Sequence, residues 1–178
     1  ARFHLSVAVF DDGTSLAALI PISHNHSGFP GGIRGEDLLH RMREQAIAYG
    51  AEFHTTRVSA LDGIRDDFRA TTEDGPFLGR TVLLATGLIN ERPPMPKALH
   101  DDALAGGLIR YCPVCDGYEV TDKRIAVVGL GPRALHEAVF LRSYSKDVTL
   151  LSPADKDGLT DEERGRLSEL GIAVRNGP

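Results

Sequence analysis

The sequence has only two cysteines in 178 residues, Cys112 and Cys115, which is too few for the disulfide framework of a small secreted protein. A reducing compartment, by default the cytoplasm, is therefore expected. No apolar stretch approaches the length of a membrane-spanning helix, and the N-terminus does not resemble a signal peptide. The net charge is −5 and there is no basic run, so no nucleic-acid-binding surface is expected. Internal repeats and low-complexity segments are also absent.

The composition is that of a folded globular protein. Hydrophobic residues make up 42% of the chain and charged residues 25%. A length of 178 residues allows one medium-sized domain or parts of two. The function must therefore be sought in motifs.

The most informative stretch contains both cysteines and reads Arg-Tyr-Cys-Pro-Val-Cys-Asp-Gly from residue 110. A Cys-x-x-Cys motif indicates either redox chemistry or a metal site. Zinc usually takes four ligands, and the nearest histidine pair, His24 and His26, lies far upstream in a loop. A purely structural disulfide would close so short a loop that it constrains little of the unfolded chain. Redox chemistry is favoured, and zinc stays the alternative.

Asp116 follows the second cysteine directly. A neighbouring carboxylate disfavours a thiolate, so it does not serve to activate the thiol. Its expected role is proton transfer during dithiol–disulfide exchange. The alternative is a turn residue before Gly117, which is a common use of Asp-Gly.

A second motif follows within a few residues. An apolar strand is expected near residues 124–129 and leads into Gly129-x-Gly131-x-x-Ala134 at the start of a helix. These small residues allow a tight turn, close approach of a pyrophosphate and helix–strand packing, and the helix N-terminus offers free N–H groups. The helix is expected to run to about Ser143, and the next strand to span residues 147–151. Together the two motifs indicate electron transfer from a nucleotide to a disulfide.

The order of these motifs resembles that of the low-molecular-weight thioredoxin reductases and their flavoprotein relatives. It runs Cys112-Pro-Val-Cys115-Asp-Gly, then a strand, then Gly-x-Gly-x-x-Ala. The resemblance covers nearly the whole chain. It implies an α/β fold with two Rossmann-like, three-layer domains that bind FAD and NAD(P). The FAD-binding part would span residues 1–110 and the NAD(P)-binding part, with the cysteines, residues 111–178.

The resemblance also implies an oxidoreductase mechanism. Hydride would pass from NAD(P)H to FAD, and the flavin would reduce a Cys112–Cys115 disulfide. Cys115 would face the flavin, Cys112 would attack the disulfide of thioredoxin or a similar protein, and Asp116 would donate a proton. The intact protein is expected to be a homodimer. The alternatives are a flavoenzyme that acts on a small-molecule dithiol or disulfide, and a non-catalytic nucleotide-binding or zinc-linked module.

In the first part the resemblance implies several FAD contacts. A strand over residues 6–10 ends at Asp11, which would hold a ribose hydroxyl or would simply be a turn residue before Gly13. Asn25, in a Gly/Pro-rich loop, would lie against the flavin, and backbone groups at Val58 would hold the adenine. A buried strand is expected over residues 80–87, and its end would close over FAD. That end consists of Ala85, Thr86 and Gly87.

Other elements are expected from periodicity. Residues 36–49 form an amphipathic helix with Met42 in its buried stripe and Gly50 after its end. Residues 51–58 and 68–72 form strands, and the prolines at 93–96 make an extended crossing before the second domain. Thr160 is expected to cap a helix that ends at Gly171, followed by a strand from Ile172.

Nicotinamide cofactor preference is open. An acid about 20 residues past the glycines would hold the ribose of NAD, and arginines would hold the 2′-phosphate of NADP. Ser152 is the candidate contact at this strand end, and the His-Arg-Arg segment of typical thioredoxin reductases is missing. Preference for NADPH is therefore in doubt.

The resemblance further implies that both domains are incomplete in this chain. The FAD glycine motif would lie upstream, with residues 1–3 as the tail of the first helix, and both domains would continue beyond residue 178. We therefore expect these 178 residues by themselves to bind FAD weakly or not at all.

Overall fold

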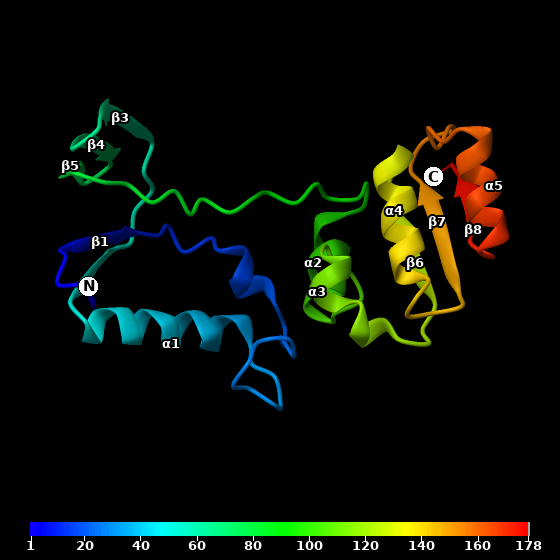
Figure 1. Ribbon diagram of the computed structural model, residues 1–178, viewed down its shortest axis with the longest axis horizontal. Coiled ribbons are helices and arrows are strands. Elements are labelled where there is room, and N and C mark those ends of the chain that lie inside the picture. Colours follow the sequence, from blue (N-terminus) through cyan, green and yellow to red (C-terminus); the bar gives the residue numbers. More distant parts are fainter. Residues whose placement is uncertain (178) are drawn as a thin grey trace. The chain divides into compact units, whose positions relative to one another are not determined.

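The computed structural model describes residues 1–177. The chain divides into two compact units, residues 1–89 and residues 90 onward (Figure 1). The compact units divide before residue 110, and the domain boundary expected between residues 110 and 111 stays a prediction. Helix α2 (Lys97–Ala105) belongs with the second unit, where His100 Nε2 lies 2.6 Å from the hydroxyl of Tyr111.

The second unit is built on a parallel sheet. Strands β6 (Ile125–Val128), β7 (Val148–Ser152) and β8 (Ala173–Asn176) are hydrogen-bonded in the order β6-β7-β8. Helix α4 (Gly131–Leu141) connects the first two strands, and helix α5 (Asp161–Glu169) connects the last two. This is the strand–helix–strand–helix–strand half of a doubly wound nucleotide-binding sheet, and it confirms the expected α/β class.

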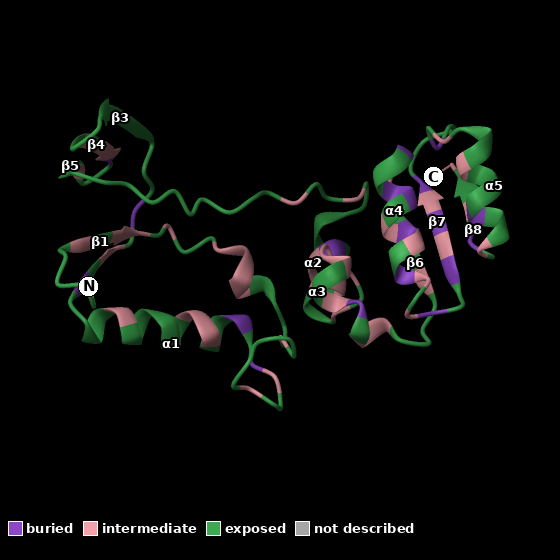
Figure 2. Cartoon of the chain, viewed as in Figure 1, coloured by how far each residue is buried: buried purple, intermediate pink, exposed green. Residues whose placement is uncertain are grey.

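The core of the chain lies between this sheet and its two helices. Side chains of β7 alternate between buried and half-buried, and Leu150 at its centre is fully buried. Leu167 of α5 and Ala138 of α4 are also fully buried against the same cluster. Figure 2 shows this burial along α4 and β7. The side of β6 that carries Val128 is half exposed, so the described part of this sheet is covered on one face.

The sequence explains where α5 begins and ends. The side chain of Thr160 accepts a hydrogen bond from the backbone of Glu163, and Glu163 in turn accepts one from the backbone of Thr160, which is a capping box. Gly171 follows the helix with φ +68°, a value that suits glycine. The expected cap and helix end are both confirmed.

Just before α5, the carboxylate of Asp157 is fully buried. It accepts hydrogen bonds from both terminal nitrogens of Arg164, with 2.6 Å from Nη2 to Oδ1, and one of 3.0 Å from the backbone N–H of Leu159. Burial raises the pKa of Asp157, but the hydrogen bonds from Leu159, Arg164 and Asn176 outweigh burial, and the net pKa is lowered. Asp157 therefore stabilises the fold in its ionised form.

This arrangement predicts acid sensitivity of the second unit. Because the folded-state pKa lies below the unfolded one, the stabilisation is fully present above the usual pKa of about 4 and is lost as pH falls towards the folded value. Urea unfolding of the wild type at about pH 6 and about pH 3 should show a larger loss of stability than unfolding of Asp157→Asn over the same interval. Equal losses in the two proteins would contradict this assignment.

Three short elements precede the sheet. Helix α2 is followed by helix α3 (Pro113–Asp116) and by the 3₁₀ helix η2 (Tyr118–Val120). Pro113 is in the first turn of α3, a position where its fixed φ fits and its missing N–H costs nothing. The cysteine motif is therefore helical from its second residue.

The first unit contains two small sheets. Strands β1 (Val7–Phe10) and β2 (Ala51–His54) pair in parallel and are connected through the 3₁₀ helix η1 (Leu16–Leu19) and helix α1 (Gly35–Ala48). Strands β3 (Ala60–Ile64), β4 (Asp67–Thr72) and β5 (Gly75–Gly79) form an antiparallel meander. The expected helix over 36–49 and strand over 68–72 are confirmed, whereas β3 and β5 were not expected.

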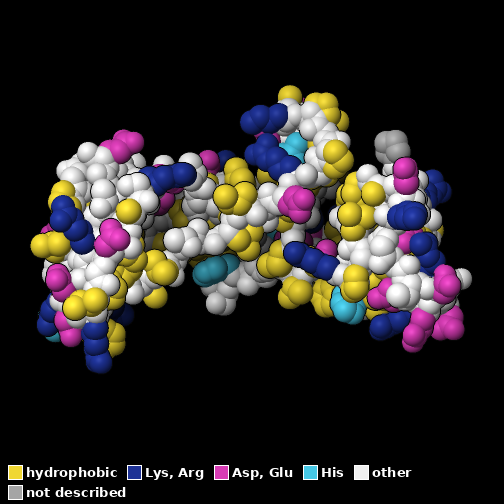
Figure 3. Space-filling view, turned by 90° about the horizontal axis from the view of Figure 1, so that it is seen from above, with side chains coloured by type: hydrophobic (Ala, Val, Ile, Leu, Met, Phe, Trp, Pro, Cys, Tyr) yellow, Lys and Arg dark blue, Asp and Glu magenta, His cyan; other side chains and the backbone are white. Residues whose placement is uncertain are grey.

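Three expectations for the first unit are wrong. Residues 80–87 form no strand, and Leu83 is 91% exposed. Strand β2 ends at His54, so Val58 lies in the connection after it. Met42 is 57% exposed rather than in the core. Figure 3 shows many such hydrophobic side chains on the surface of the chain.

The errors at residues 80–87 and at Met42 have one physical cause. A strand with apolar residues on both faces needs neighbouring strands and covering layers, and no described strand pairs with residues 80–87. Among the described residues of the first unit, Ile33 and Ala51 are the buried apolar ones, so α1 has little to pack against.

Within the described chain, no helix combines the length and hydrophobicity needed to cross a membrane.

Candidate redox site

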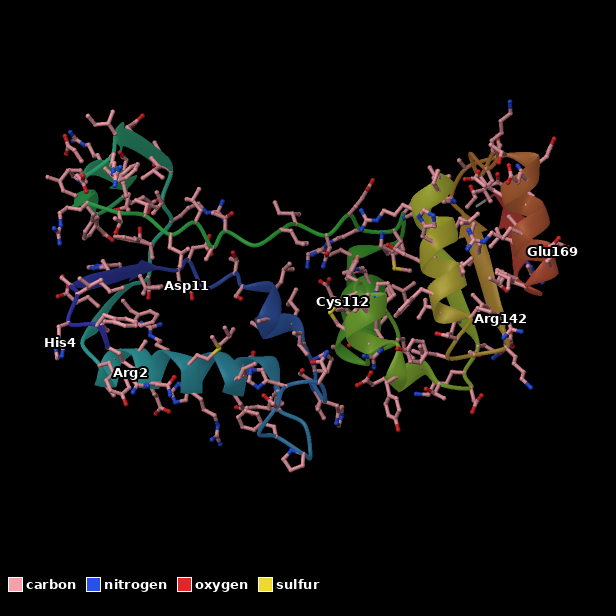
Figure 4. All side chains as sticks on the ribbon, in the orientation of Figure 1. Arg2, His4, Asp11, Cys112, Arg142 and Glu169 are labelled. Carbon is pink, nitrogen blue, oxygen red and sulfur yellow. A yellow bond between two sulfur atoms is a disulfide. The ribbon has the colours of Figure 1, made fainter. Side chains whose placement is uncertain are left out.

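The two cysteines form a disulfide at the N-terminus of α3 (Figure 4). Cys112 is the N-cap residue, and its sulfur accepts a 3.1 Å hydrogen bond from the backbone N–H of Cys115. The backbone carbonyl of Cys112 accepts from the N–H groups of Cys115 and Asp116, each at 3.1 Å. Cys112 is half-buried and Cys115 is exposed, so the disulfide lies at the surface of its unit. Their separate chemical roles stay predictions.

Gly117 lets the motif pack closely against the sheet domain. Its backbone is helical, with φ −60°, so a left-handed turn is not what requires glycine here. A Cβ at this position would lie 2.6 Å from Cε2 of Tyr144 and 2.8 Å from the carbonyl oxygen of Pro113. Asp116-Gly117 therefore continues a helical turn rather than forming the tight turn that Asp-Gly often marks.

Asp116 is half-buried and pairs with Arg110, whose Nη1 lies 3.2 Å from Oδ1. Burial raises the pKa of Asp116, and the negative charge of Glu119 raises it further, while Arg110 acts in the opposite direction. The net pKa is raised. A carboxyl that holds its proton to higher pH than usual is better suited to donate one near neutrality, which agrees with the expected role.

Arg110 is a site residue that the sequence reasoning missed. It lies in the same stretch as the cysteines, but a separation of six residues from Asp116 does not imply contact until α3 has formed. The signal that could have found it is charge balance, since a half-buried carboxylate needs a nearby cation or donor.

A second missed feature anchors the residue before Cys112. His100 is 2% exposed, with Nδ1 at 2.9 Å from Oδ1 of Asp101 and Nε2 at 2.6 Å from the hydroxyl of Tyr111. Hydrogen bonds from Lys97 and then His100 lower the pKa of Asp101 to about 2. Burial raises the pKa of Tyr111, so its phenol stays protonated. This chain of polar groups ties α2 to the start of the cysteine motif.

The glycine turn after β6 is tight and packs closely against the start of α4. A Cβ on Gly129 would lie 2.9 Å from Cβ of Ala134, so glycine permits the close helix–strand packing, and Gly131 has φ +62°. However, the N–H of Gly131 already donates to the carbonyl of Asp157 at 2.7 Å, and Pro132 has no N–H. The turn therefore leaves fewer free donors than such a turn usually offers, and a contact with the pyrophosphate of a nicotinamide dinucleotide stays a prediction.

Ser152 ends β7, as expected, but its side chain is 1% exposed. Its hydroxyl donates to the carbonyl of Ala154 at 2.9 Å and accepts from the N–H of the same residue at 3.2 Å. The hydroxyl is thus engaged within its own turn. A nucleotide contact at Ser152 stays a prediction.

Two of the expected FAD contacts lie near each other. Asp11 follows β1, and its N–H donates to His54 at the end of β2, so the segments that carry Asp11 and Val58 leave the same end of the parallel pair. The carboxylate of Asp11 accepts from the N–H of Gly13 at 2.9 Å, the contact of a turn residue. The ribose contact is untested.

Asp12, which sequence reasoning passed over, carries the ion pair of this region. Its Oδ2 lies 2.7 Å from Nε of Arg57, and hydrogen bonds from Thr14 and then Arg57 lower the pKa of Asp12 to about 2. This pair joins the turn after β1 to the segment after β2.

The other expected FAD contacts are on separate segments. Asn25 is in the exposed loop and accepts a 2.8 Å hydrogen bond from Ser23. Ala85, Thr86 and Gly87 lie in the exposed, irregular segment after β5. In the described first unit, a hydrogen bond and an ion pair thus link the segments of Asp11 and Val58, and the FAD contacts of Asn25 and of Ala85–Gly87 stay predictions.

Comparison with known proteins agrees with this geometry. The family model of the pyridine nucleotide-disulphide oxidoreductases matches residues 1–178. A parallel nucleotide-type sheet next to a redox-type disulfide is what such proteins combine, and the chain belongs to this family. Enzymes of this kind use FAD and NAD(P)H, as expected from the resemblance.

The relatives are more specific. The chain is 34% identical over 160 residues to a thioredoxin reductase of Streptomyces coelicolor and 32% identical over 160 residues to one of Streptomyces clavuligerus, with 87% of this chain and 48% of each relative covered. The crystal structure of HlmI matches with a TM-score of 0.83 and 30% identity, over 99% of this chain and 55% of that one. Thioredoxin reductase from Streptococcus pyogenes matches with a TM-score of 0.86 and 26% identity, over 98% and 57%.

These comparisons confirm the expected thioredoxin reductase-like class and its Rossmann-like architecture. The chain spans about half the length of the curated relatives it matches.

Proposed function

We propose that a protein containing this chain at the full length of its relatives is a flavin-dependent disulfide reductase that passes electrons from NAD(P)H to thioredoxin. The observation that carries the proposal is the Cys112–Cys115 disulfide, with Asp116 next to Cys115 in the chain, in the same compact unit as the glycine turn after β6. The relatives named thioredoxin reductase support it and favour it over a small-molecule dithiol as substrate.

The cysteine chemistry balances as two thiol–disulfide exchanges. The thiolate of reduced Cys112 attacks one sulfur of the thioredoxin disulfide, which forms a mixed disulfide and releases the other thioredoxin sulfur as a thiolate. The thiolate of Cys115 then attacks Cys112, which restores the Cys112–Cys115 disulfide and frees reduced thioredoxin. Asp116 supplies a proton to a leaving thiolate. Bound reduced FAD would supply the two electrons that reopen the disulfide.

The cofactor contacts are proposed by residue. Gly129, Gly131 and Ala134 would admit the pyrophosphate of NAD(P)H, with Ser152 at the neighbouring strand end. Asp11, Asn25, Val58 and the Ala85–Gly87 segment would contact FAD. Residues 1–110 would belong to the FAD-binding domain and residues 111–178 to the NAD(P)-binding domain.

Partner, assembly and location belong to the same proposal. A bifunctional thioredoxin reductase/thioredoxin of Mycobacterium leprae is 34% identical over 161 residues, covering 88% of this chain and 34% of that relative, which supports thioredoxin as partner. We propose a cytoplasmic location, since a single closely spaced cysteine pair suits a reducing compartment. A homodimer is proposed from the resemblance to the thioredoxin reductases.

The test is a turnover assay on the full-length protein loaded with FAD. Oxidation of NADPH and of NADH is followed separately with thioredoxin and with small disulfides such as oxidised glutathione as electron acceptors. Thioredoxin should support the largest kcat/KM. If only small disulfides are reduced, the protein-substrate proposal fails, and if no acceptor is reduced, the reductase proposal fails.

The 178-residue chain by itself should bind FAD weakly or not at all. The segments expected to contact FAD are exposed, and residues 80–87 have no strand partner among the described residues. Gel filtration of the chain with excess FAD, followed by absorbance of the protein peak in the visible range, measures this directly. A yellow protein peak with stoichiometric flavin would contradict the prediction.

A further inference from the structure

Arg110 and Asp116 flank the disulfide on both sides in the chain. Nη1 of Arg110 lies 3.2 Å from Oδ1 of Asp116, with 29% and 31% of the two side chains exposed. The pair therefore closes a loop that contains Cys112 and Cys115. Unlike a fully solvated surface pair, it is partly shielded from water, so its charges interact more strongly.

The guanidinium of Arg110 is held independently of the disulfide. Its Nε donates to the carbonyl of Gly107 at 3.1 Å. Gly107 has φ +68°, and a Cβ there would lie 3.2 Å from Nη2 of Arg110. The N–H groups of Leu108 and Ile109 both donate to the carbonyl of Ala103, at 2.8 and 3.2 Å. The end of α2 thus fixes the segment from which Arg110 reaches Asp116.

Asp116 also faces a second carboxylate. Glu119 of η2 acts on Asp116 as a like charge, and its Oε2 is buried with no hydrogen-bond partner among the described residues. From the α4 side, the ring of Tyr144 lies against Gly117, next to Asp116 in the chain. Burial and Glu119 favour the neutral form of Asp116, and Arg110 is the charge that opposes them.

We propose that Arg110 is the positioning residue of this site: its salt bridge holds the Asp116 carboxyl beside the cysteines and sets the balance between its charged and neutral forms. The role of Arg110 in disulfide reduction rests on the proposed function, but the salt bridge between Arg110 and Asp116 can be tested without that function. When the disulfide opens, the covalent link between residues 112 and 115 is lost, while the link between residues 110 and 116 stays. The salt bridge keeps the two thiols close in the reduced state.

The first experiment measures the protonation of Asp116 directly. Carbon-13 NMR follows the Asp116 carboxyl of the oxidised 178-residue chain against pH. In Arg110→Gln the midpoint should move to higher pH, because the opposing positive charge is gone and burial and Glu119 act alone. Arg110→Lys should return the midpoint towards wild type. Arg65→Gln, which removes an exposed arginine of the first unit, should leave it unchanged.

A midpoint that does not move in Arg110→Gln overturns the proposal. So does an equal shift in Arg65→Gln, which would show an effect of net charge rather than of position.

The second experiment measures how well the site holds its thiols together. Two glutathione thiols reduce the Cys112–Cys115 disulfide and become oxidised glutathione, so electrons and protons balance, and the equilibrium ratio is read by mass after alkylation. Arg110→Gln should shift the ratio towards the dithiol by roughly two- to five-fold, the range that a partly exposed ion pair supports. Asp116→Asn should give a similar shift, and the double variant should add little to either.

If the shifts of the two single variants add up in the double variant, Arg110 and Asp116 act separately, which would overturn the inference. Neither experiment contains flavin, nicotinamide or thioredoxin. If the full-length protein fails in turnover but both experiments give the expected results, the proposed function fails and the positioning role of Arg110 stands. If turnover succeeds and both experiments fail, the proposed function stands and the positioning role fails.

Discussion

Serine in place of Cys112 is expected to lower the rate of thioredoxin reduction by the full-length protein by about 10³-fold or more. The substitution removes the sulfur that attacks the partner, and Cys115 is the only other cysteine among these 178 residues. Serine in place of Cys115 is expected to have a loss of the same order, because the mixed disulfide can no longer be resolved. NADPH or NADH oxidation with thioredoxin as acceptor measures both.

A trapping experiment separates the two roles. Thioredoxin with a single cysteine, activated as a thionitrobenzoate mixed disulfide, should be captured by the remaining thiol of Cys115→Ser with release of coloured thionitrobenzoate. Cys112→Ser should capture it far more slowly. Val114→Ala, an exposed change between the two cysteines, serves as the control and should leave turnover within about two-fold of wild type. Faster capture by Cys112→Ser would reverse the assigned roles.

Alanine in place of Leu150 is expected to destabilise the second unit by about 2–5 kcal/mol. Leu150 lies in the central strand β7, is fully buried, and packs in the cluster formed with α4 and α5. Its truncation removes apolar contacts and leaves a cavity that a sheet under two helices cannot readily close. Hydrogen exchange of the β7 amides reports the free energy of opening of this unit without requiring the first unit to unfold with it.

The matched control is Leu108→Ala in the same unit. Leu108 is 85% exposed, so its removal should change the opening free energy by no more than about 0.5 kcal/mol. Equal effects at the two leucines would mean that the sheet and helices do not form the core described above.

The second unit was well predicted because its elements are specified locally. Each local signal acts within a few residues of chain. These signals are the small residues at 129, 131 and 134, the Thr160 capping box and Gly171. The buried apolar residues of β7 then pack against those of α4 and α5. Local preference and tertiary packing agree here.

In the first unit the same reasoning failed where partners were needed. Residues 80–87 have the composition of a buried strand, but a strand is defined by its neighbours, and none of the described strands pairs with them. Met42 lies at a helical spacing that predicts burial, yet burial requires a surface on the other side. Pattern alone could not reveal that this surface is missing from the described chain.

The sequence by itself determined that two cysteines, an acid and a glycine turn follow one another in an α/β chain, because spacing within a motif needs no third dimension. Only the tertiary structure decided that Arg110 reaches Asp116, that His100 reaches Tyr111, and that Asp157 occupies the N–H of Gly131. Such contacts depend on where helices end and how they pack. Those positions are set by burial and charge across the whole unit, and no single stretch of sequence contains them.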